Sequence, residues 1–287
     1  MSKSVSMWYE NIMFTSIIFY MKFLYLILIF LLAACSTGQL NNSKNIHNWG
    51  GGYTIEASSF SLTTYERVGG KNDLANIYIE GDGRAWVSKN RPSLDPTPKN
   101  PVALKLAQLD NSENVIYLAR PCQHTKMVDG SVCDKKYWTS HRFSSEVIEA
   151  MDSALDDIKQ RHQVTGFNLL GFSGGGNIAA LLAAERNDVL SIRTVAGNLN
   201  HNLQSEIHNV SAMPYSLNAK DVARQISHIP QIHFVGGQDK IVPAQIAQSY
   251  KAVPQSDCVK IKVIEGVDHT KGWESVWKSL LNIPLDC

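Results

Sequence analysis

The stretch Leu169–Glu185, LLGFSGGGNIAALLAAE, places one hydroxyl side chain, Ser173, among glycines. The apolar residues before Ser173 indicate the end of a buried strand, and the alanine-rich residues after it indicate a helix. A tight turn between the two needs neighbours without side chains, and Gly171, Gly174 and Gly175 meet that need. The segment fits the G-x-S-x-G nucleophile elbow, which holds a serine clear at the carboxyl end of a strand. A glycine-rich turn capped by a serine is the alternative, but the strand before and the helix after favour a nucleophile.

A serine hydroxyl is a strong nucleophile only when a base accepts its proton and an acid orients that base. In proteins that carry this elbow both partners come after later strands, the acid before the histidine, so a resemblance to them implies the same order here. Asp239 follows the apolar segment QIHFVGG, although an aspartate here would also suit a helix cap. His269 alone of the histidines follows the last strand, whereas His233 lies inside a strand and is expected in the core. Asp268 directly precedes the histidine, so we expect it to cap the loop rather than to orient the ring.

The negative charge that develops on a carbonyl oxygen needs preorganised donors. The N–H of Gly174, directly after the serine, is the first candidate. The second is expected from Glu80-Gly81-Asp82-Gly83, which follows an early strand, with the N–H of Asp82 preferred and that of Gly83 as the alternative. Because a carboxylate beside an oxyanion is unfavourable, we expect the Asp82 side chain to turn outward.

These residues need a scaffold that brings strand ends together, and the chain alternates short apolar strands with helices. Such alternation predicts a mainly parallel sheet covered by helices on both faces, with its site at the carboxyl ends of the strands. Strands are predicted at 53–57, 61–67, 75–79, 114–120, 166–171, 191–197, 231–237 and 258–266. Helices are predicted at 101–110, 144–162, 177–185, 242–253 and 272–281. The stretch 198–228 reads as irregular and too short for a large lid, which favours an open site.

The order GFSGG, GGQDKIVP and GVDHTKGW resembles the α/β hydrolase superfamily over about residues 53–281. The chain also resembles exported, lipobox-bearing bacterial α/β hydrolases that carry similar PCQ, YWTSHRFS and TVAGNLNH stretches. The resemblance implies an α/β-hydrolase fold and a triad of Ser173, Asp239 and His269 that cleaves an ester, thioester or amide, with no cofactor. No metal is expected, because the sequence has no paired short-spaced cysteines with histidines that would form a zinc site. The chain departs from the lipase and esterase pattern because EGDG stands where many relatives have a His-Gly pair.

The amino terminus predicts export. From Met21 to Cys35, a lysine, an apolar run and small residues precede a cysteine, which is the layout of a signal peptide over residues 1–34. Leu32-Ala33-Ala34-Cys35 resembles a lipobox, so Cys35 is expected to carry lipid and to anchor the protein in the cell envelope, facing the periplasm. Ser36 favours the outer membrane under the enteric sorting rule. A transmembrane anchor is the alternative. A polar tether is expected over 35–52, before the hydrolase domain at 53–287.

The remaining cysteines fit an oxidising compartment. Four are left after Cys35, and of the three possible pairings their positions favour Cys122 with Cys133 and Cys258 with Cys287. The nearly balanced charges, 27 basic against 26 acidic residues, argue against a nucleic-acid partner. We expect a monomer acting on a small-molecule or acyl substrate.

Residues from two further loops are expected at the rim of the site. The loop 121–143 carries Tyr137, Trp138 and Arg142. Trp138 and Arg142 would bind an acyl chain or an acidic group, although a disulfide-tied loop also needs an aromatic to pack on. The segment 198–213 is the other. Two alternatives to the hydrolase stay open: a binding lipoprotein that reuses the fold, and a peptidase of the serine aminopeptidase type.

Overall fold

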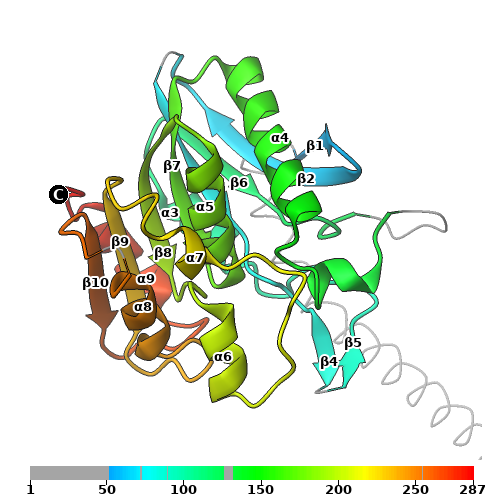
Figure 1. Cartoon of the computed structure of the whole chain (residues 1–287). Helices are drawn as coiled ribbons and strands as arrows, with labels where there is room; N and C mark the ends of the chain where they lie inside the picture. The colour runs from blue at the N-terminus through cyan, green and yellow to red at the C-terminus, as the bar shows by residue number, and fades with distance from the viewer. Residues whose placement is uncertain (1–51, 72, 89, 126–131, 254) are drawn as a thin grey trace, which may run out of the picture. The chain divides into compact units, whose positions relative to one another are not determined.

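The computed structural model describes residues 52–287 apart from positions 72, 89, 126–131 and 254 (Figure 1). The predicted signal peptide, Cys35 and the tether up to residue 51 lie outside the described residues and stay predictions. Within the described part, no helix combines the length and the apolar character needed to cross a membrane.

An eight-stranded sheet forms the centre of residues 52–287, in the order β1-β2-β6-β3-β7-β8-β9-β10 (Figure 1). The six strands from β6 to β10 are parallel, and β2 runs antiparallel to both of its neighbours. The strands are β1 (Gly52–Ala57), β2 (Phe60–Val68), β3 (Leu74–Ile79), β6 (Asn114–Leu118), β7 (Gly166–Phe172), β8 (Val189–Val195), β9 (Gln231–Gly236) and β10 (Val259–Ile264). The mainly parallel sheet predicted from the sequence is confirmed.

Helices cover both faces of this sheet. On one face α5 packs on β7 and β8 and touches α4 and α7, while on the other α3 packs on β3 and β6 and touches α9. The helices are α3 (Val102–Leu109), the 3-10 turn η1 (Lys135–Trp138), α4 (Ser145–His162), α5 (Gly174–Glu185), α6 (His201–Ile207), α7 (Ala219–Val222), α8 (Ala244–Lys251) and α9 (Trp273–Leu281).

Burial explains why these segments take these forms. Every residue of β6 and of β9 is buried, as expected for strands covered on both faces. The apolar residues of α4 recur at helical spacing and all face the core, including Val147, Met151 and Leu155. The core therefore lies on both sides of the parallel strands, and their carboxyl ends share one edge.

The structure differs from the sequence prediction between residues 198 and 228, where it contains α6 and α7. Both helices are too short for a strong periodic signal, and polar contacts fix them. The Asn200 side chain accepts from the N–H of Leu203 and caps α6, and Asn177 of α5 bonds the backbone of Leu217 and Ala219. The sequence reading also missed the hairpin of β4 (Trp86–Ser88) and β5 (Arg91–Pro92).

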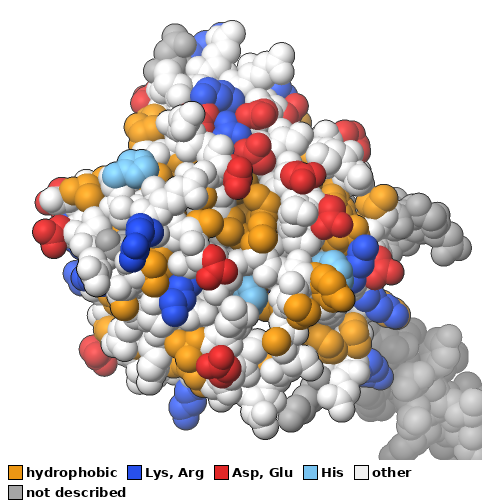
Figure 2. Space-filling model, in the orientation of Figure 1, with side chains coloured by type: hydrophobic (Ala, Val, Ile, Leu, Met, Phe, Trp, Pro, Cys, Tyr) orange, Lys and Arg blue, Asp and Glu red, His pale blue; other side chains and the backbone are white. Residues whose placement is uncertain are grey.

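Two disulfides join Cys122 to Cys133 and Cys258 to Cys287, the pairing that their positions favoured. The second ties the chain after α9 to the residue directly before β10. On the face shown in Figure 2, acidic and basic side chains are interspersed. Arg186 forms ion pairs with Asp152 of α4 and with Asp188, which directly precedes β8.

Candidate active site

Ser173 occupies the turn between β7 and α5 with φ 50° and ψ −119°, a strained backbone conformation for a residue with a side chain. Backbone hydrogen bonds hold it there: its N–H donates to Val195, and its carbonyl accepts from the N–H of Asn198. Two glycines are obligatory for the turn. A Cβ on Gly171 would lie 2.3 Å from the Gly175 carbonyl oxygen, and one on Gly175 would lie 2.3 Å from the Ile79 carbonyl oxygen.

His269 and Asp239 lie in line with this hydroxyl, although they come from loops far apart in the sequence. The His269 Nε2 atom is 3.1 Å from Ser173 Oγ, and its Nδ1 atom is 2.8 Å from Asp239 Oδ2. A carboxylate only accepts hydrogen bonds, so Nδ1 carries the proton in the neutral ring and Nε2 is free to accept from the serine. The structure thus brings together the three residues that the sequence singled out.

The second oxygen of Asp239 is also bonded. Asp239 Oδ1 accepts from the N–H groups of Ile241 and Val242, each at 2.8 Å, and the side chain is fully buried. These bonds fix the carboxylate so that Oδ2 faces the histidine. Asp268 caps its own loop instead, as expected: its Oδ1 accepts from the N–H groups of Thr270 and Lys271, and these bonds lower its pKa.

His233 lies in the core, as expected. It is fully buried in β9 beside Thr194 Oγ1, 2.9 Å from its Nδ1, and burial lowers its pKa to about 3.

The loop after β3 lies against the elbow. A Cβ on Gly174 would lie 2.1 Å from Asp82 Oδ1, and one on Gly81 would lie 3.2 Å from the Ser173 Cβ. Gly83 has φ +62° and lies so close to the Pro96 carbonyl that no larger residue fits. The Gln123 side chain donates to the Gly81 carbonyl oxygen at 2.9 Å and holds the loop from the other side.

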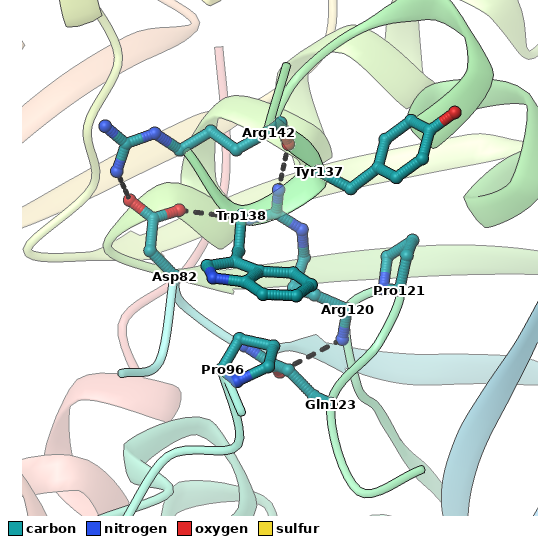
Figure 3. Close-up of a pocket in the computed structure, with 8 residues that line it drawn as sticks. All are labelled: Asp82, Pro96, Arg120, Pro121, Gln123, Tyr137, Trp138 and Arg142. Carbon is teal, nitrogen blue, oxygen red and sulfur yellow. Dashed lines mark hydrogen bonds and ion pairs between the residues drawn. The ribbon is translucent and has the colours of Figure 1, made fainter. Parts of the chain in front are cut away.

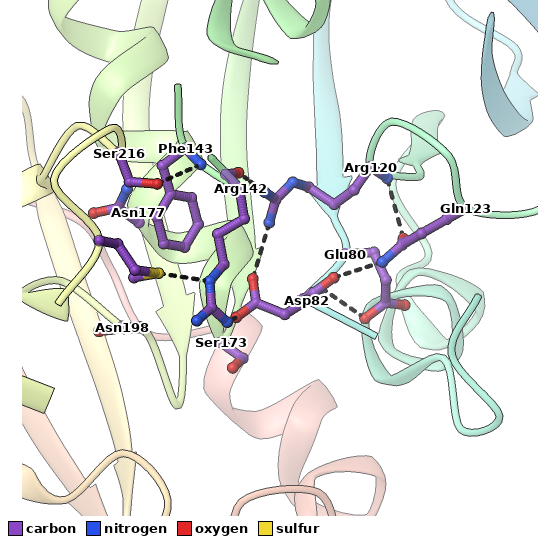
Figure 4. A network of polar contacts seen from close by, with 12 residues as sticks. Glu80, Asp82, Arg120, Gln123, Arg142, Phe143, Ser173, Asn177, Asn198 and Ser216 are labelled. Carbon is purple, nitrogen blue, oxygen red and sulfur yellow. Dashed lines mark hydrogen bonds and ion pairs between the residues drawn. The ribbon is translucent and has the colours of Figure 1, made fainter. Parts of the chain in front are cut away.

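The expectation that Asp82 turns its side chain outward is wrong. The carboxylate points inward, where Asp82 Oδ1 is 3.2 Å from Arg120 Nη1 and Oδ2 is 2.7 Å from Arg142 Nη1 (Figure 4). Burial would raise the pKa of Asp82, but Arg142 and Arg120 together hold it below its ordinary value. Two guanidinium groups therefore remove the electrostatic penalty on which the expectation was based.

Arg120 is a residue that the sequence reading did not select. It ends the apolar segment NVIYLAR at the carboxyl end of β6, and it is 4% exposed. Its guanidinium also donates to the Arg142 backbone carbonyl and lies 5.1 Å from the centre of the Phe143 ring. A charged side chain directly after a buried strand, at the edge that carries the elbow, was the signal that would have identified it.

Glu80 is a second buried charged residue to which the sequence analysis assigns no role. It is 1% exposed. Its Oε1 accepts from the N–H of Gly81 at 2.9 Å, while Oε2 is buried without a hydrogen-bond partner within the described residues. Burial raises its pKa from 4.5 to about 7, against the lowering effect of the Gly81 N–H and of the first amides of α3. Glu80 is thus a buried side chain that holds the loop after β3.

A small, partly open hollow lies beside Asp82, on the side of the loop 121–143. The residues that line it are Asp82, Pro96, Arg120, Pro121, Gln123, Tyr137, Trp138 and Arg142 (Figure 3). Trp138 is 4% exposed and donates through Nε1 to the Ser93 carbonyl oxygen, so it packs as a structural residue and forms one wall of this hollow. The predicted rim loop 121–143 therefore does reach the site.

The other predicted rim segment, 198–213, also reaches it. The N–H of Asn198 bonds the Ser173 carbonyl, and the Met213 sulfur accepts from Arg142 Nε at 2.9 Å. The segment is therefore joined both to the elbow and to the arginine pair.

A protein-family model described as serine hydrolase (FSH1) matches residues 101–264, more than half of the chain. The search of curated proteins found no match to this chain. Similar solved structures include an alpha-beta serine hydrolase homologue from Coxiella burnetii, with 18% identity and a TM-score of 0.52 over 80% of this chain and 93% of that chain. Est1E from Butyrivibrio proteoclasticus is 15% identical, with a TM-score of 0.55 over 81% and 98%. An esterase of Pyrococcus furiosus is 11% identical, with a TM-score of 0.60 over 83% and 91%. At these identities the likeness concerns the fold, which is the α/β hydrolase fold.

Proposed function

This chain belongs to the FSH1 family of serine hydrolases, and we propose that it is an envelope-anchored enzyme that cleaves an ester, thioester or amide through an acyl-enzyme. The observation that carries the proposal is the chain of contacts from Ser173 Oγ through the His269 ring to Asp239 Oδ2, at 3.1 and 2.8 Å.

In the first half of the proposed reaction Ser173 Oγ attacks the substrate carbonyl carbon while His269 Nε2 accepts the hydroxyl proton. The buried Asp239 carboxylate stabilises the imidazolium that forms and keeps the ring in its orientation. His269 then gives the proton to the leaving group, the bond to that group breaks, and the acyl group remains on the serine.

The oxyanion of this step is stabilised by N–H groups that the fold fixes in advance. The N–H of Gly174 begins α5, and we assign the N–H of Asp82 as the second donor, because the loop 80–83 packs directly against the elbow. Within the described residues, no acceptor bonds the Asp82 N–H, which leaves it available to a substrate. The ion pairs of the Asp82 carboxylate keep its own charge neutralised.

In the second half a water molecule takes the place of the leaving group. His269 Nε2 accepts a proton from the water, the hydroxide attacks the acyl carbon, and the serine recovers its proton when the acid product leaves. The site needs no cofactor for these steps.

The anchoring part of the proposal rests on the sequence from Met21 to Cys35 and on the two disulfides, which suit an exported protein. Metabolic labelling with palmitate tests it: the full chain is expected to incorporate label, and Cys35→Ser is expected to abolish incorporation. Label that persists in Cys35→Ser would refute lipidation at this residue.

The catalytic part is tested with a fluorophosphonate probe on the domain from residue 36 onward, with its disulfides intact. We expect the probe to modify Ser173, as mapped by mass spectrometry of the peptides, and the label to vanish in Ser173→Ala. His269→Ala is expected to slow labelling strongly, because the serine loses its base. A folded sample that takes up no probe would refute the mechanism and favour a binding protein on the same fold.

A further inference from the structure

The charge beside the nucleophile is not balanced. Arg120 and Arg142 share the single carboxylate of Asp82, so the cluster carries one excess positive charge. Both oxygens of Asp239 are bonded and Asp268 caps its own loop, so neither balances this charge. Glu80 also lies near Arg120, but burial raises its pKa to about 7, and the excess positive charge remains while Glu80 is protonated.

The part of this positive charge that a substrate could reach lies on the Arg142 guanidinium. Its Nη1 bonds Asp82 and its Nε bonds the Met213 sulfur, but within the described residues no acceptor bonds its Nη2. That nitrogen is not among the buried unpaired polar atoms, and the side chain is 20% exposed, so Nη2 reaches solvent. Arg120, in contrast, has a side chain that is only 5% exposed.

The exposed guanidinium lies next to the space where the reaction would take place. Asp82, to which Arg142 is bonded, packs directly against Gly174, the residue after the nucleophile. Figure 4 shows the Arg142 guanidinium at the Asp82 carboxylate, on the side of Ser173. Asp82 Oδ2 is 2.7 Å from Arg142 Nη1 and would be 3.2 Å from a Cβ on Gly174, so the Arg142 guanidinium lies close to the residue that follows the nucleophile.

We propose that Arg142 selects substrates that carry an anionic group, such as a carboxylate, close to the scissile bond. This inference rests on the proposed hydrolase function and names the substrate class of that site. A guanidinium nitrogen that is fixed by two other bonds offers a preorganised charge-assisted donor, which loses little side-chain freedom on binding. A role limited to holding Asp82 would not require an unpaired nitrogen at the mouth of the site.

The negative charge can belong to the acyl group or to the leaving group, and matched esters distinguish the two. For the acyl side, the 4-nitrophenyl half-ester of glutaric acid is compared with 4-nitrophenyl valerate, which has the same number of acyl carbons and no charge. For the leaving group, 4-carboxyphenyl acetate is compared with its methyl ester. The quantity measured is the ratio of kcat/KM for the charged ester to kcat/KM for the neutral one.

For the wild-type protein we expect a ratio of about 10 or more in one of the two pairs, the effect of one charge-assisted hydrogen bond. Arg142→Gln is expected to bring that ratio close to 1, mainly through KM, while hydrolysis of the neutral ester continues and shows that the protein is folded. Arg142→Lys keeps the charge and is expected to retain part of the preference. Lys135→Gln removes an exposed charge from the same loop and is the matched control, with an unchanged ratio.

Two results would overturn the inference: a wild-type ratio near or below 1 in both pairs of esters, or a preference for the charged ester that persists unchanged in Arg142→Gln. The hydrolase function would still stand in either case, provided that the protein hydrolyses the neutral ester and that Ser173→Ala abolishes this activity. A preference that Lys135→Gln lowers as much as Arg142→Gln would also overturn the inference, because it would reflect overall charge. If the wild-type protein takes up no fluorophosphonate and hydrolyses none of the four esters, the proposed function itself fails.

Discussion

Glu80 is expected to make the stability of the protein depend on pH, and the substitution Glu80→Gln isolates this effect. The carboxyl is buried and its pKa rises from 4.5 to about 7, since burial outweighs the Gly81 N–H and the α3 amides that favour the charged form. A pKa that is higher in the folded state means that the group stabilises the fold fully below pH 4.5, its ordinary value, and that this stability is lost as the pH rises to about 7.

The magnitude follows from the size of the shift. Each pKa unit corresponds to about 1.4 kcal/mol, so a rise from 4.5 to about 7 means that ionisation of Glu80 lowers the free energy of unfolding by roughly 3 kcal/mol. Glutamine has the shape of the protonated acid and stays neutral. Any fixed cost of placing its amide nitrogen where Oε2 now lies is the same at every pH.

The assay is urea unfolding of the disulfide-intact domain, followed by tryptophan fluorescence at several values between about pH 4.5 and 8. The quantity to plot is the unfolding free energy of Glu80→Gln minus that of the wild type, because groups common to both proteins cancel. We expect this difference to increase by roughly 3 kcal/mol across the range, with the variant gaining at high pH. A difference that stays flat, or that decreases with pH, would refute the assignment of a buried carboxyl with a raised pKa.

Three other predictions test the site and the fold. Asp239→Asn is expected to lower kcat on a neutral ester by about a thousandfold or more, because the histidine loses the partner that fixes its tautomer. Asp268→Asn is expected to change kcat by less than about threefold. Steady-state kinetics on both variants decide which aspartate orients the ring. Gly174→Ala would place a Cβ 2.1 Å from Asp82 Oδ1, so we expect the loop 80–83 to move. Fluorophosphonate labelling is then expected to slow by about a hundredfold, while the circular dichroism spectrum stays that of the wild type. Replacing Cys258 and Cys287 by serine opens a loop of 29 residues and is expected to lower the unfolding free energy by about 3 to 4 kcal/mol, measured in urea against the oxidised wild type; an unchanged midpoint would contradict it.

The scaffold was predictable because its signals are local. Continuous apolar runs such as NVIYLAR and QIHFVGG occur only where a strand is covered on both faces, and the α4 segment repeats its apolar residues at helical spacing. The proximity of Ser173, Asp239 and His269 followed from the same logic, since parallel strands bring their carboxyl ends to one edge. Three residues that each follow a strand are therefore close in space although they are far apart in the sequence.

What could not be predicted depends on contacts between distant segments. Asn177, a residue of α5, holds the segment of α6 and α7 through hydrogen bonds to the backbone of Leu217 and Ala219. The sequence of that segment itself does not predict these bonds. The orientation of Asp82 was predicted wrongly for a similar reason. The prediction considered only the repulsion between the Asp82 carboxylate and an oxyanion. In the structure, Arg120 and Arg142 reach the carboxylate from two other segments and neutralise it.

These contacts also explain how the chain can hold an aspartate in the EGDG loop beside the nucleophile. An aspartate next to the nucleophile is tolerable only if positive charge accompanies it, and one guanidinium would neutralise it without leaving any charge for a substrate. The second guanidinium comes from Arg142, at the far end of the loop that the Cys122–Cys133 disulfide shortens. Asp82, Arg120 and Arg142 thus act as one unit, in which the aspartate positions the arginine and the arginine neutralises the aspartate. A change at Arg142 is therefore expected to alter the preference between charged and neutral substrates while turnover of the neutral substrate continues, whereas a change at Asp239 alters catalysis for charged and neutral substrates alike.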